Sequence, residues 1–183
     1  MSELQDSFVG YYKETKDKVF NYLMYRLNFD RVLAEDLFMD VVLKAYRHFG
    51  DFNPQKGSFK TWIFALAHNH LVNYWRDRRR SEGLSLDQLE EQGQSVAVTD
   101  SMEAEVSQSI ENEKVGRILS MMGEGEREVI VLRYLEGLDY AEISQITSKK
   151  EGAIRTGLSR ALDRFGSLYK KIYPSEPKAK LKR

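Results

Sequence analysis

The chain lacks cysteine altogether, which excludes disulfide bonds, thiolate zinc sites and thiol redox chemistry. Proline is also scarce and occurs only at Pro54, Pro174 and Pro177, so long stretches are free to form helices. No apolar run approaches the ~18 residues of a membrane span, and the N-terminus has no charged-then-apolar signal pattern. These absences predict a helical protein of the reducing cytoplasm without a membrane span.

Opposite charges are present in equal number, 28 basic and 28 acidic residues, but their distribution is uneven. Residues 1–80 carry a net charge of +3, residues 81–113 carry −9, and residues 114–183 carry +6. Hydrophobic residues make up 42% of the chain, which is typical of a globular protein rather than a disordered one. Two basic segments joined by an acidic one indicate a polyanionic partner.

Two helices are expected over residues 4–27 and 31–48, because apolar residues recur there at helical spacing. Their predicted core positions are Phe8, Tyr12, Val19, Phe20, Leu23, Leu27, Ala34, Leu37, Phe38, Val41, Val42, Ala45 and Tyr46. On the second helix, Asp36, Asp40 and Lys44 face outward. Two carboxylates four residues apart leave two interpretations open, a hydrated face or a docking surface for a basic partner.

Residues 59–80 predict a single helix with two unlike faces. The spacing of a buried stripe is found for Ile63, Leu66, Ala67, His70, Leu71 and Tyr74. A second stripe contains Trp62, Asn69, Asn73, Arg76 and Arg80. An aromatic ring, two carboxamides and two guanidinium groups suit a nucleic-acid strand, although a solvated face is the alternative. The preceding loop, residues 50–58, is placed to form the wall of a pocket beside this helix.

Residues 81–100 contain no lysine or arginine and show no sustained periodicity, which predicts a flexible acidic linker. A linker of this kind is usually only solubilising. The alternative is that it lies in a positively charged channel in place of a nucleic acid.

The C-terminal part predicts a helix-turn-helix. After a helix over residues 102–122, a further helix stops near Gly137, and Asp139 is suited to cap a short helix that ends near Ile146. Residues 147–150 form a tight turn before a longer helix that begins at Glu151. Its expected core positions are Ile154, Leu158, Ala161 and Phe165. From residue 149 onward there are 11 basic residues against three acidic ones, which favours a DNA-groove-facing helix with a basic tail.

Three blocks of the sequence, in this order, resemble the extracytoplasmic-function sigma factors of the sigma-70 family. AEDLFMDVVLKAYRH (34–48) is similar to the segment that grips the clamp helices of RNA polymerase. FKTWIFALAHNHLVNYWRDRRR (59–80) resembles the promoter-melting segment without a gap. GEREVIVLRYLEGLDYAEISQI (125–146) and EGAIRTGLSRAL (151–162) resemble the domain that reads the −35 element.

The resemblance implies an all-α protein of two small helical domains joined by a flexible acidic linker, the second domain being a helix-turn-helix. Residues 1–80 would bind core polymerase and recognise and melt the −10 region, and residues 81–104 would be the linker. Residues 105–173 would recognise the −35 element, followed by a basic tail at 174–183. A sigma factor is not an enzyme, and we expect no cofactor and no metal. The implied partners are core RNA polymerase and promoter DNA, with an anti-sigma factor left open.

The resemblance also suggests individual site residues. Polymerase binding is expected from Asp36, Asp40 and Lys44. Binding of the −10 element is expected from Asp51, Phe52, Asn53, Lys60, Trp62, Asn69, Asn73, Arg76 and Arg79. Binding of the −35 element is expected from Lys150, Arg155, Thr156, Ser159 and Arg160.

The chain departs from the family pattern at several of these places. Ala65, His68 and Gly157 stand where the family tends to have arginine, and Asn73 replaces a usual aspartate. In the turn of the helix-turn-helix, a Leu-Gly-Ile-Ser-like sequence is replaced by residues 147–150, TSKK. Its serine lacks the freedom of glycine at positive φ, and its first lysine replaces an apolar residue that normally fills the core. These changes predict a looser or differently shaped turn.

Two other functions are consistent with parts of the sequence. A stand-alone helix-turn-helix regulator would leave the polar stripe of residues 62–80 and the acidic linker without a role. A divalent-metal nuclease built on Asp36 and Asp40 would need more converging carboxylates.

Overall fold

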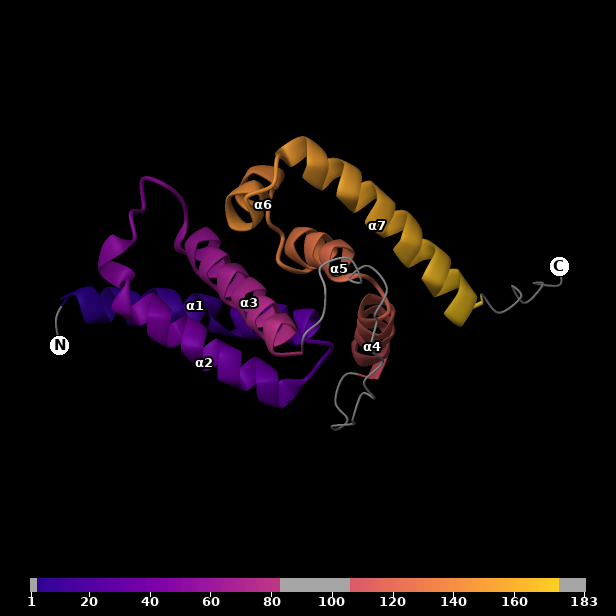
Figure 1. Ribbon diagram of the computed structural model, residues 1–183, viewed down its shortest axis with the longest axis horizontal. Coiled ribbons are helices and arrows are strands. Elements are labelled where there is room, and N and C mark those ends of the chain that lie inside the picture. The colour runs from indigo at the N-terminus through magenta and orange to yellow at the C-terminus, as the bar shows by residue number, and fades with distance from the viewer. Residues whose placement is uncertain (1–2, 83–105, 175–183) are drawn as a thin grey trace, which may run out of the picture.

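The computed structural model describes residues 3–82 and 106–174, and every regular element in these ranges is helical (Figure 1). We call residues 3–82 the N-lobe and residues 106–174 the C-lobe. The N-lobe contains α1 (Glu3–Arg26), α2 (Arg31–Arg47), the 3₁₀ turn η1 (Phe49–Asp51) and α3 (Phe59–Glu82). The C-lobe contains α4 (Val106–Ser120), α5 (Glu124–Ile130), the π-helical turn η3 (Val131–Leu135), α6 (Tyr140–Thr147) and α7 (Glu151–Ile172). The all-α prediction is confirmed, whereas nearly all of the predicted linker and tail lies outside the described residues.

The N-lobe is a three-helix packing in which α2 lies against both α1 and α3. The side chain of Asp30 accepts a hydrogen bond from the backbone N–H of Leu33 and so caps α2, an interaction worth about 1 kcal/mol. Val19, Leu23, Val41, Ile63, Ala67 and Leu71 are almost fully buried between the helices. At one end, the rings of Phe8, Phe49 and Phe59 meet edge to face. This core fixes the orientation of α3, which carries the predicted nucleic-acid stripe.

The C-lobe has the predicted helix-turn-helix, formed by α6 and α7. Asp139 caps α6, and its side chain and that of Glu142 bond reciprocally to each other's backbone N–H groups. Gly137 has φ +66, as expected for the glycine that ends the preceding helical segment. Three of the four predicted core positions of α7, Ile154, Leu158 and Ala161, are buried, and Phe165 is partly buried against them.

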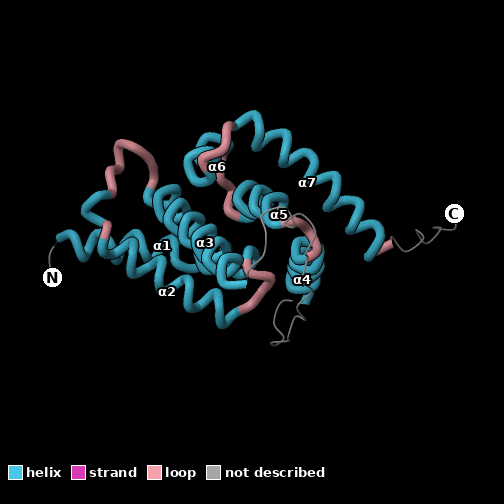
Figure 2. Tube along the Cα trace, in the orientation of Figure 1, coloured by secondary structure: helices cyan, strands magenta, loops and turns pink. Residues whose placement is uncertain are grey.

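The two lobes pack directly against each other. α6 of the C-lobe lies on α3 of the N-lobe, and α5 lies against α1, while short loops connect the helices of each lobe (Figure 2). The hydroxyl of Tyr22 in α1 donates to Glu128 Oε1 in α5 at 3.1 Å, and Thr61 Oγ1 in α3 donates to Glu142 Oε1 in α6 at 3.1 Å, so hydrogen bonds cross between the lobes. None of the helices in the described ranges combines the length and apolar character that a membrane span requires.

Candidate nucleic-acid and polymerase interfaces

The predicted polar stripe of α3 lies on the side of the helix away from α6. Asn69 and Arg76 are exposed, and Asn73 is half-buried. Trp62 is half-buried as well, because its ring packs 5.5 Å from Phe52 and 5.4 Å from Phe59, measured between ring centroids. The indole ring of Trp62 thus packs into the aromatic core, and the rest of its surface is exposed to solvent and available to a partner.

The loop before α3 brings its three predicted residues to the same end of the stripe. Phe52 is half-buried in the aromatic cluster beside Trp62, and its neighbours Asp51 and Asn53 are exposed. Asp51 Oδ2 lies 3.0 Å from His48 Nδ1, and Asn53 Oδ1 accepts a hydrogen bond of 2.9 Å from the N–H of Gln55. The structure therefore groups the loop residues with Trp62, with polar side chains around an aromatic surface.

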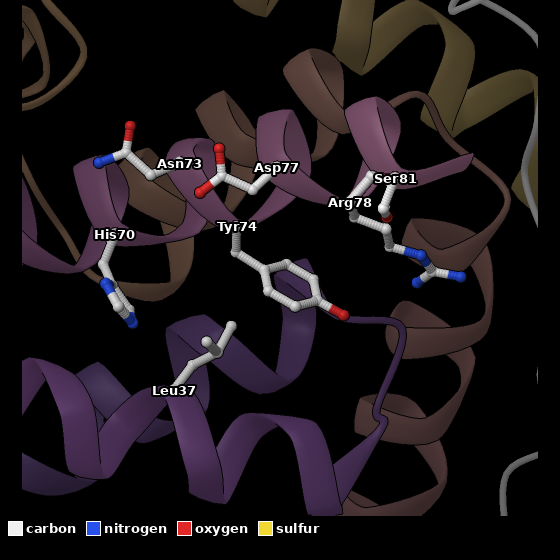
Figure 3. Close-up of a pocket in the computed structure, with 7 residues that line it drawn as sticks. All are labelled: Leu37, His70, Asn73, Tyr74, Asp77, Arg78 and Ser81. Atoms are coloured by element: carbon white, nitrogen blue, oxygen red, sulfur yellow. The ribbon is translucent and has the colours of Figure 1, made fainter. Parts of the chain in front are cut away.

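A pocket of about 460 Å³ lies between α2 and the second half of α3 (Figure 3). It is lined by Leu37, His70, Asn73, Tyr74, Asp77, Arg78 and Ser81. Tyr74 and His70 point from α3 toward α2, and Leu37 rises from α2 toward them (Figure 3). Asn73 thus belongs to both the polar stripe and the rim of this pocket, which sequence reasoning did not foresee.

Lys60 is separated from the other residues predicted for the −10 element. Its ammonium group donates a hydrogen bond to the backbone carbonyl of Glu136 in the C-lobe. The neighbouring Thr61 donates from Oγ1 to Glu142 Oε1 at 3.1 Å. This side of α3 is therefore occupied by the C-lobe in the observed arrangement.

The outer face of α2 is open to solvent and carries more apolar surface than predicted. Asp36 and Asp40 are exposed, and Asp40 Oδ2 lies 3.3 Å from His70 Nε2; Lys44 is half-buried. Four large apolar side chains of α2 are also exposed to solvent: Val32 (72%), Met39 (63%), Leu43 (49%) and Tyr46 (47%). Tyr46 was expected in the core but is exposed, although its ring packs against that of Phe8 in a T-shaped contact with centroids 5.3 Å apart. These four residues are separated by seven, four and three positions in the sequence, a spacing that could have predicted a single apolar face on this helix.

The five residues predicted for the −35 element are all exposed, at the N-terminus and along the outer face of α7. Arg155 is held on two sides. Its Nη2 donates to Glu151 Oε2 at 3.0 Å, and its guanidinium group lies 4.8 Å from the centre of the Tyr140 ring. Arg133 lies 4.9 Å from the centre of the same ring. Tyr140 and Arg133 were not identified from the sequence.

The unusual turn before α7 contains one residue in the left-handed conformation and one hydrogen bond back to α6. Ser148 has φ +57, so it adopts the left-handed conformation that glycine would accept more easily. The backbone carbonyl of Lys149 accepts a hydrogen bond of 2.7 Å from Ser144 Oγ, and its Nζ lies 3.7 Å from Glu128 Oε2. The lysine that replaces an apolar residue therefore lies near a buried carboxylate.

Glu128 is the centre of a charged cluster buried between the lobes. Its Oε1 accepts hydrogen bonds from the Tyr22 hydroxyl at 3.1 Å, from His68 Nδ1 at 2.7 Å and from Arg26. The side chains of Arg26 and Glu128 are only 4% and 3% exposed. Burial raises the pKa of Glu128, but Arg26, His68 and Lys149 outweigh it and hold the pKa well below its usual range. The carboxylate is thus ionised at neutral pH.

Arg127, next to Glu128, bonds to the ends of two helices. It donates to the carbonyls of Leu119 and Met122 at the end of α4, and to those of Tyr25 and Arg26 at the end of α1. Burial, reinforced by the charge of Arg26, lowers its pKa to about 10, so it remains charged at neutral pH. A cation at two helix C-termini satisfies carbonyl groups that lack a helical partner.

These two lobes, one with a polar helix stripe and one with a helix-turn-helix, are typical of helical DNA-binding proteins. A family model described as Sigma-70 region 2 matches residues 11–81, and one described as Sigma-70, region 4 matches residues 112–165. The ECF RNA polymerase sigma factor SigK of Mycobacterium sp. (strain KMS) is 30% identical over 169 residues, with 86% of this chain and 83% of the relative covered. The chain therefore belongs to the extracytoplasmic-function RNA polymerase sigma factors of the sigma-70 family, a family of transcription regulators.

Other relatives agree with this assignment. BldN of Streptomyces coelicolor is 30% identical over 86% of this chain, which spans 58% of that protein. SigM of Bacillus subtilis is 27% identical, with 86% of this chain and 92% of the relative covered.

Solved structures share the fold. The sigma factor RpoE, crystallised with the anti-sigma factor NepR from Bartonella quintana, has a TM-score of 0.73 at 23% identity. That match covers 90% of this chain and 97% of RpoE. CnrH, in complex with the cytosolic domain of CnrY, has a TM-score of 0.64 at 18% identity over 91% of this chain and 90% of its own. The family resemblance inferred from the sequence is confirmed.

Proposed function

We propose that this sigma factor directs promoter-specific initiation by reading the −10 element with its N-lobe and the −35 element with its C-lobe. The observation that carries the proposal is that two separate nucleic-acid-type faces are exposed. One is the stripe of α3, in which Asn69 and Arg76 are exposed while Trp62 and Asn73 are half-buried, and the other is the outer face of α7. The domain functions are assigned accordingly, to residues 1–80 and 105–173, with 81–104 as the linker.

In the N-lobe, we expect the non-template strand of the −10 element to follow the stripe of α3. Base stacking on an aromatic side chain is worth about 1–3 kcal/mol, comparable to the cost of unstacking one base. An extruded base would then be held beside Trp62 by Asp51, Phe52 and Asn53. Asn69, Asn73, Arg76 and Arg79 would contact base edges and phosphates, joined by Lys60 once it leaves the C-lobe.

In the C-lobe, the exposed guanidinium groups of Arg155 and Arg160 are the candidates for base contacts in the major groove. Lys150, Thr156 and Ser159 lie beside them and would position the helix on the phosphates and sugar edges. Because phosphate contacts carry no sequence information, discrimination is assigned to the two arginines.

Core RNA polymerase would dock on the outer face of α2. Asp36 and Asp40 supply negative charge for a basic partner, Lys44 lies beside them, and Met39 and Leu43 supply apolar area at the centre. A protein that works on polymerase in this way acts in the cytoplasm. The structure of RpoE in complex with the anti-sigma factor NepR supports an anti-sigma factor as a further partner.

The test is transcription with purified core polymerase and sequencing of the transcripts. We expect defined start sites only when the chain is present, and Arg155→Ala and Arg160→Ala should each weaken −35 discrimination by about 1–3 kcal/mol. Free protein should bind promoter duplex poorly. Tight sequence-specific binding without polymerase would support a stand-alone regulator, and an unchanged footprint with both alanine variants would contradict the placement on α7.

A further inference from the structure

The pocket between α2 and α3 is separate from the loop and the indole ring that were assigned to an extruded base. Tyr74, which lines the pocket, follows Trp62 on α3 by twelve residues, or about 18 Å along the helix. The pocket has a volume of about 460 Å³, within the range of roughly 300–1,000 Å³ that is usual for ligand sites. It is therefore large enough to hold a ligand of its own.

Two rows of side chains from α3 line this pocket, and the members of each row are four residues apart. The first row consists of His70, Tyr74 and Arg78, and the second of Asn73, Asp77 and Ser81. Side chains at this spacing lie above one another on one face of a helix, so each row follows α3. In the first row, His70 and Tyr74 point toward α2 (Figure 3). The first row therefore forms the wall of the pocket, and the second row provides its polar edge.

The walls of the pocket suit a flat ring. The ring of Tyr74 extends from α3 toward α2, and Leu37 rises from α2 to face it (Figure 3). Leu37 is buried and so is fixed by the core, while Tyr74 is half-buried and packs with its ring centroid 5.4 Å from that of Trp75. An aromatic face and a fixed aliphatic side chain offer stacking and apolar contact to a planar ligand.

The polar edge of the pocket specifies the hydrogen bonds that such a ligand must make. The carboxylate of Asp77 only accepts, so it requires a donor on the ligand, whereas the carboxamide of Asn73 both donates and accepts. An asparagine carboxamide matches the amino group and the ring nitrogen N7 of adenine, and a carboxylate accepts from an amino group of a base. Because an amino group has two N–H donors, both side chains can bond to the same one.

Other classes of ligand fit this pocket less well. Its one ionised carboxylate, that of Asp77, is balanced by the guanidinium group of Arg78, so the lining has no excess positive charge for a free phosphate. In the part of the chain that the structure describes, no group of three or more His, Asp or Glu side chains could hold a metal ion. The match that remains is an uncharged planar ring with donors and acceptors on its edge, which describes a nucleobase.

We propose that this pocket binds a nucleobase with an exocyclic amino group, adenine being the best match. Tyr74 stacks on the base, Asp77 accepts from its amino group, and Asn73 bonds to the amino group and the adjacent ring nitrogen. The base has two possible sources, a DNA strand or a free nucleoside. Only the strand source rests on the proposed function, since Asn73 belongs both to the stripe along which the −10 strand would run and to the rim of the pocket.

The nucleoside source is tested by NMR titration of the full chain with deoxyadenosine and with thymidine. Deoxyadenosine should shift the backbone amide signals of α2 and α3 around the pocket and reach saturation. Thymidine should bind about tenfold more weakly, because it has no exocyclic amino group. Asp77→Asn should narrow this preference, because the amide can also donate a hydrogen bond. Asp77 is an exposed residue, and a purely structural role would not change which base is preferred.

Asn73→Ala should lower the affinity for deoxyadenosine about tenfold, because the paired hydrogen bonds to the base edge are lost. The matched control is Asn21→Ala, an exposed asparagine on α1 that does not line the pocket. This control should leave the affinity for deoxyadenosine unchanged.

The strand source is tested on the complex with core polymerase. The probes are non-template single strands of a promoter identified by transcript sequencing, each with one abasic site. Besides the position beside Trp62, we expect a second position where loss of the base weakens binding about tenfold. Asn73→Ala should abolish the effect of the abasic site at that second position alone, whereas Asn21→Ala should preserve it.

The two experiments distinguish the possible results. Deoxyadenosine binding without a second abasic-sensitive position identifies a free nucleoside as the ligand, and the reverse identifies a base of the strand. The proposal is overturned if Asn73→Ala changes neither the titration nor the effect of any abasic site. Promoter-specific transcription with that negative result would leave the proposed function intact. Deoxyadenosine binding without promoter-specific transcription would leave the pocket intact and reject the proposed function.

Discussion

At the scale of single residues, the Tyr140 ring contacts two guanidinium groups, those of Arg133 and Arg155, at 4.9 and 4.8 Å from its centre. Arg133 is itself fixed, since its Nη1 donates to the carbonyl of Leu138 at 2.8 Å. Together with Glu151, the ring therefore restricts the orientation of Arg155 before any DNA is present. Pre-organisation of this kind lowers the entropy cost of a base contact.

Tyr140→Leu should therefore weaken −35 discrimination by about 1 kcal/mol, because the flat, electron-rich face that orients Arg155 is lost. Tyr140→Phe is the control, since it keeps the ring and should keep discrimination close to that of the parent. The measurement is competition between promoters that differ by one base pair in the −35 element, with polymerase present. Equal discrimination by the leucine variant would show that Arg155 needs no support from the ring.

At the scale of elements, much of the secondary structure follows from the sequence alone. Asp139 predicted the start of α6, Gly137 predicted the end of the segment before it, and the 3.6-residue pattern predicted the core face of α7. These features are local, so composition and spacing specify them. The π-helical form of residues 131–135 was not predicted, because it depends on bonds such as the one from the N–H of Glu136 to the carbonyl of Val131.

Burial on a second side of α3 was also missed. Phe64 is fully buried, and His68 contacts Glu128, although the pattern predicted only the stripe that faces α2. A helix that packs on two partners usually has a wider apolar face. On α3, part of the second buried face is polar, so the apolar pattern does not reveal it. Periodicity cannot reveal a polar group whose partner lies 60 residues away in the sequence. The same reason explains why the role of Glu128 was not foreseen.

The turn between α6 and α7 gives a prediction about stability. Ser148 is held at φ +57, a conformation that costs an L-residue roughly 1–2 kcal/mol. Ser148→Gly should remove that cost, although glycine also raises the conformational entropy of the unfolded chain. The net effect should be an increase of about 0.5–1 kcal/mol in the free energy of unfolding. Thermal unfolding should show a Tm about 1–4 °C higher. The control is Ser167→Gly in the interior of α7, which should lower the Tm. A lower Tm for Ser148→Gly would instead mean that the serine side chain stabilises the turn.

At the scale of the whole molecule, the packing of the lobes is linked to pH through Glu136. This carboxyl belongs to the C-lobe and is 8% exposed, facing Lys60 of α3, and Lys18 and Tyr25 of α1. Burial raises its pKa to about 7, although the two lysines act in the opposite direction. In the unfolded chain the pKa is near its ordinary value of 4.5. At a pH between about 4.5 and 7, the native state therefore still holds a proton that the unfolded chain has lost.

The sign of the effect follows from this difference. Below about pH 4.5 both states hold the proton and Glu136 imposes no penalty, whereas above about pH 7 the native state must bury an ionised carboxylate. The contribution of this group to stability is thus lost as the pH rises from about 4.5 through 7. Glu136→Gln mimics the protonated form, so the variant and the parent should have similar urea midpoints at pH 5, with the variant higher at pH 8. A difference that stays constant across this range would show that another group determines the pH dependence.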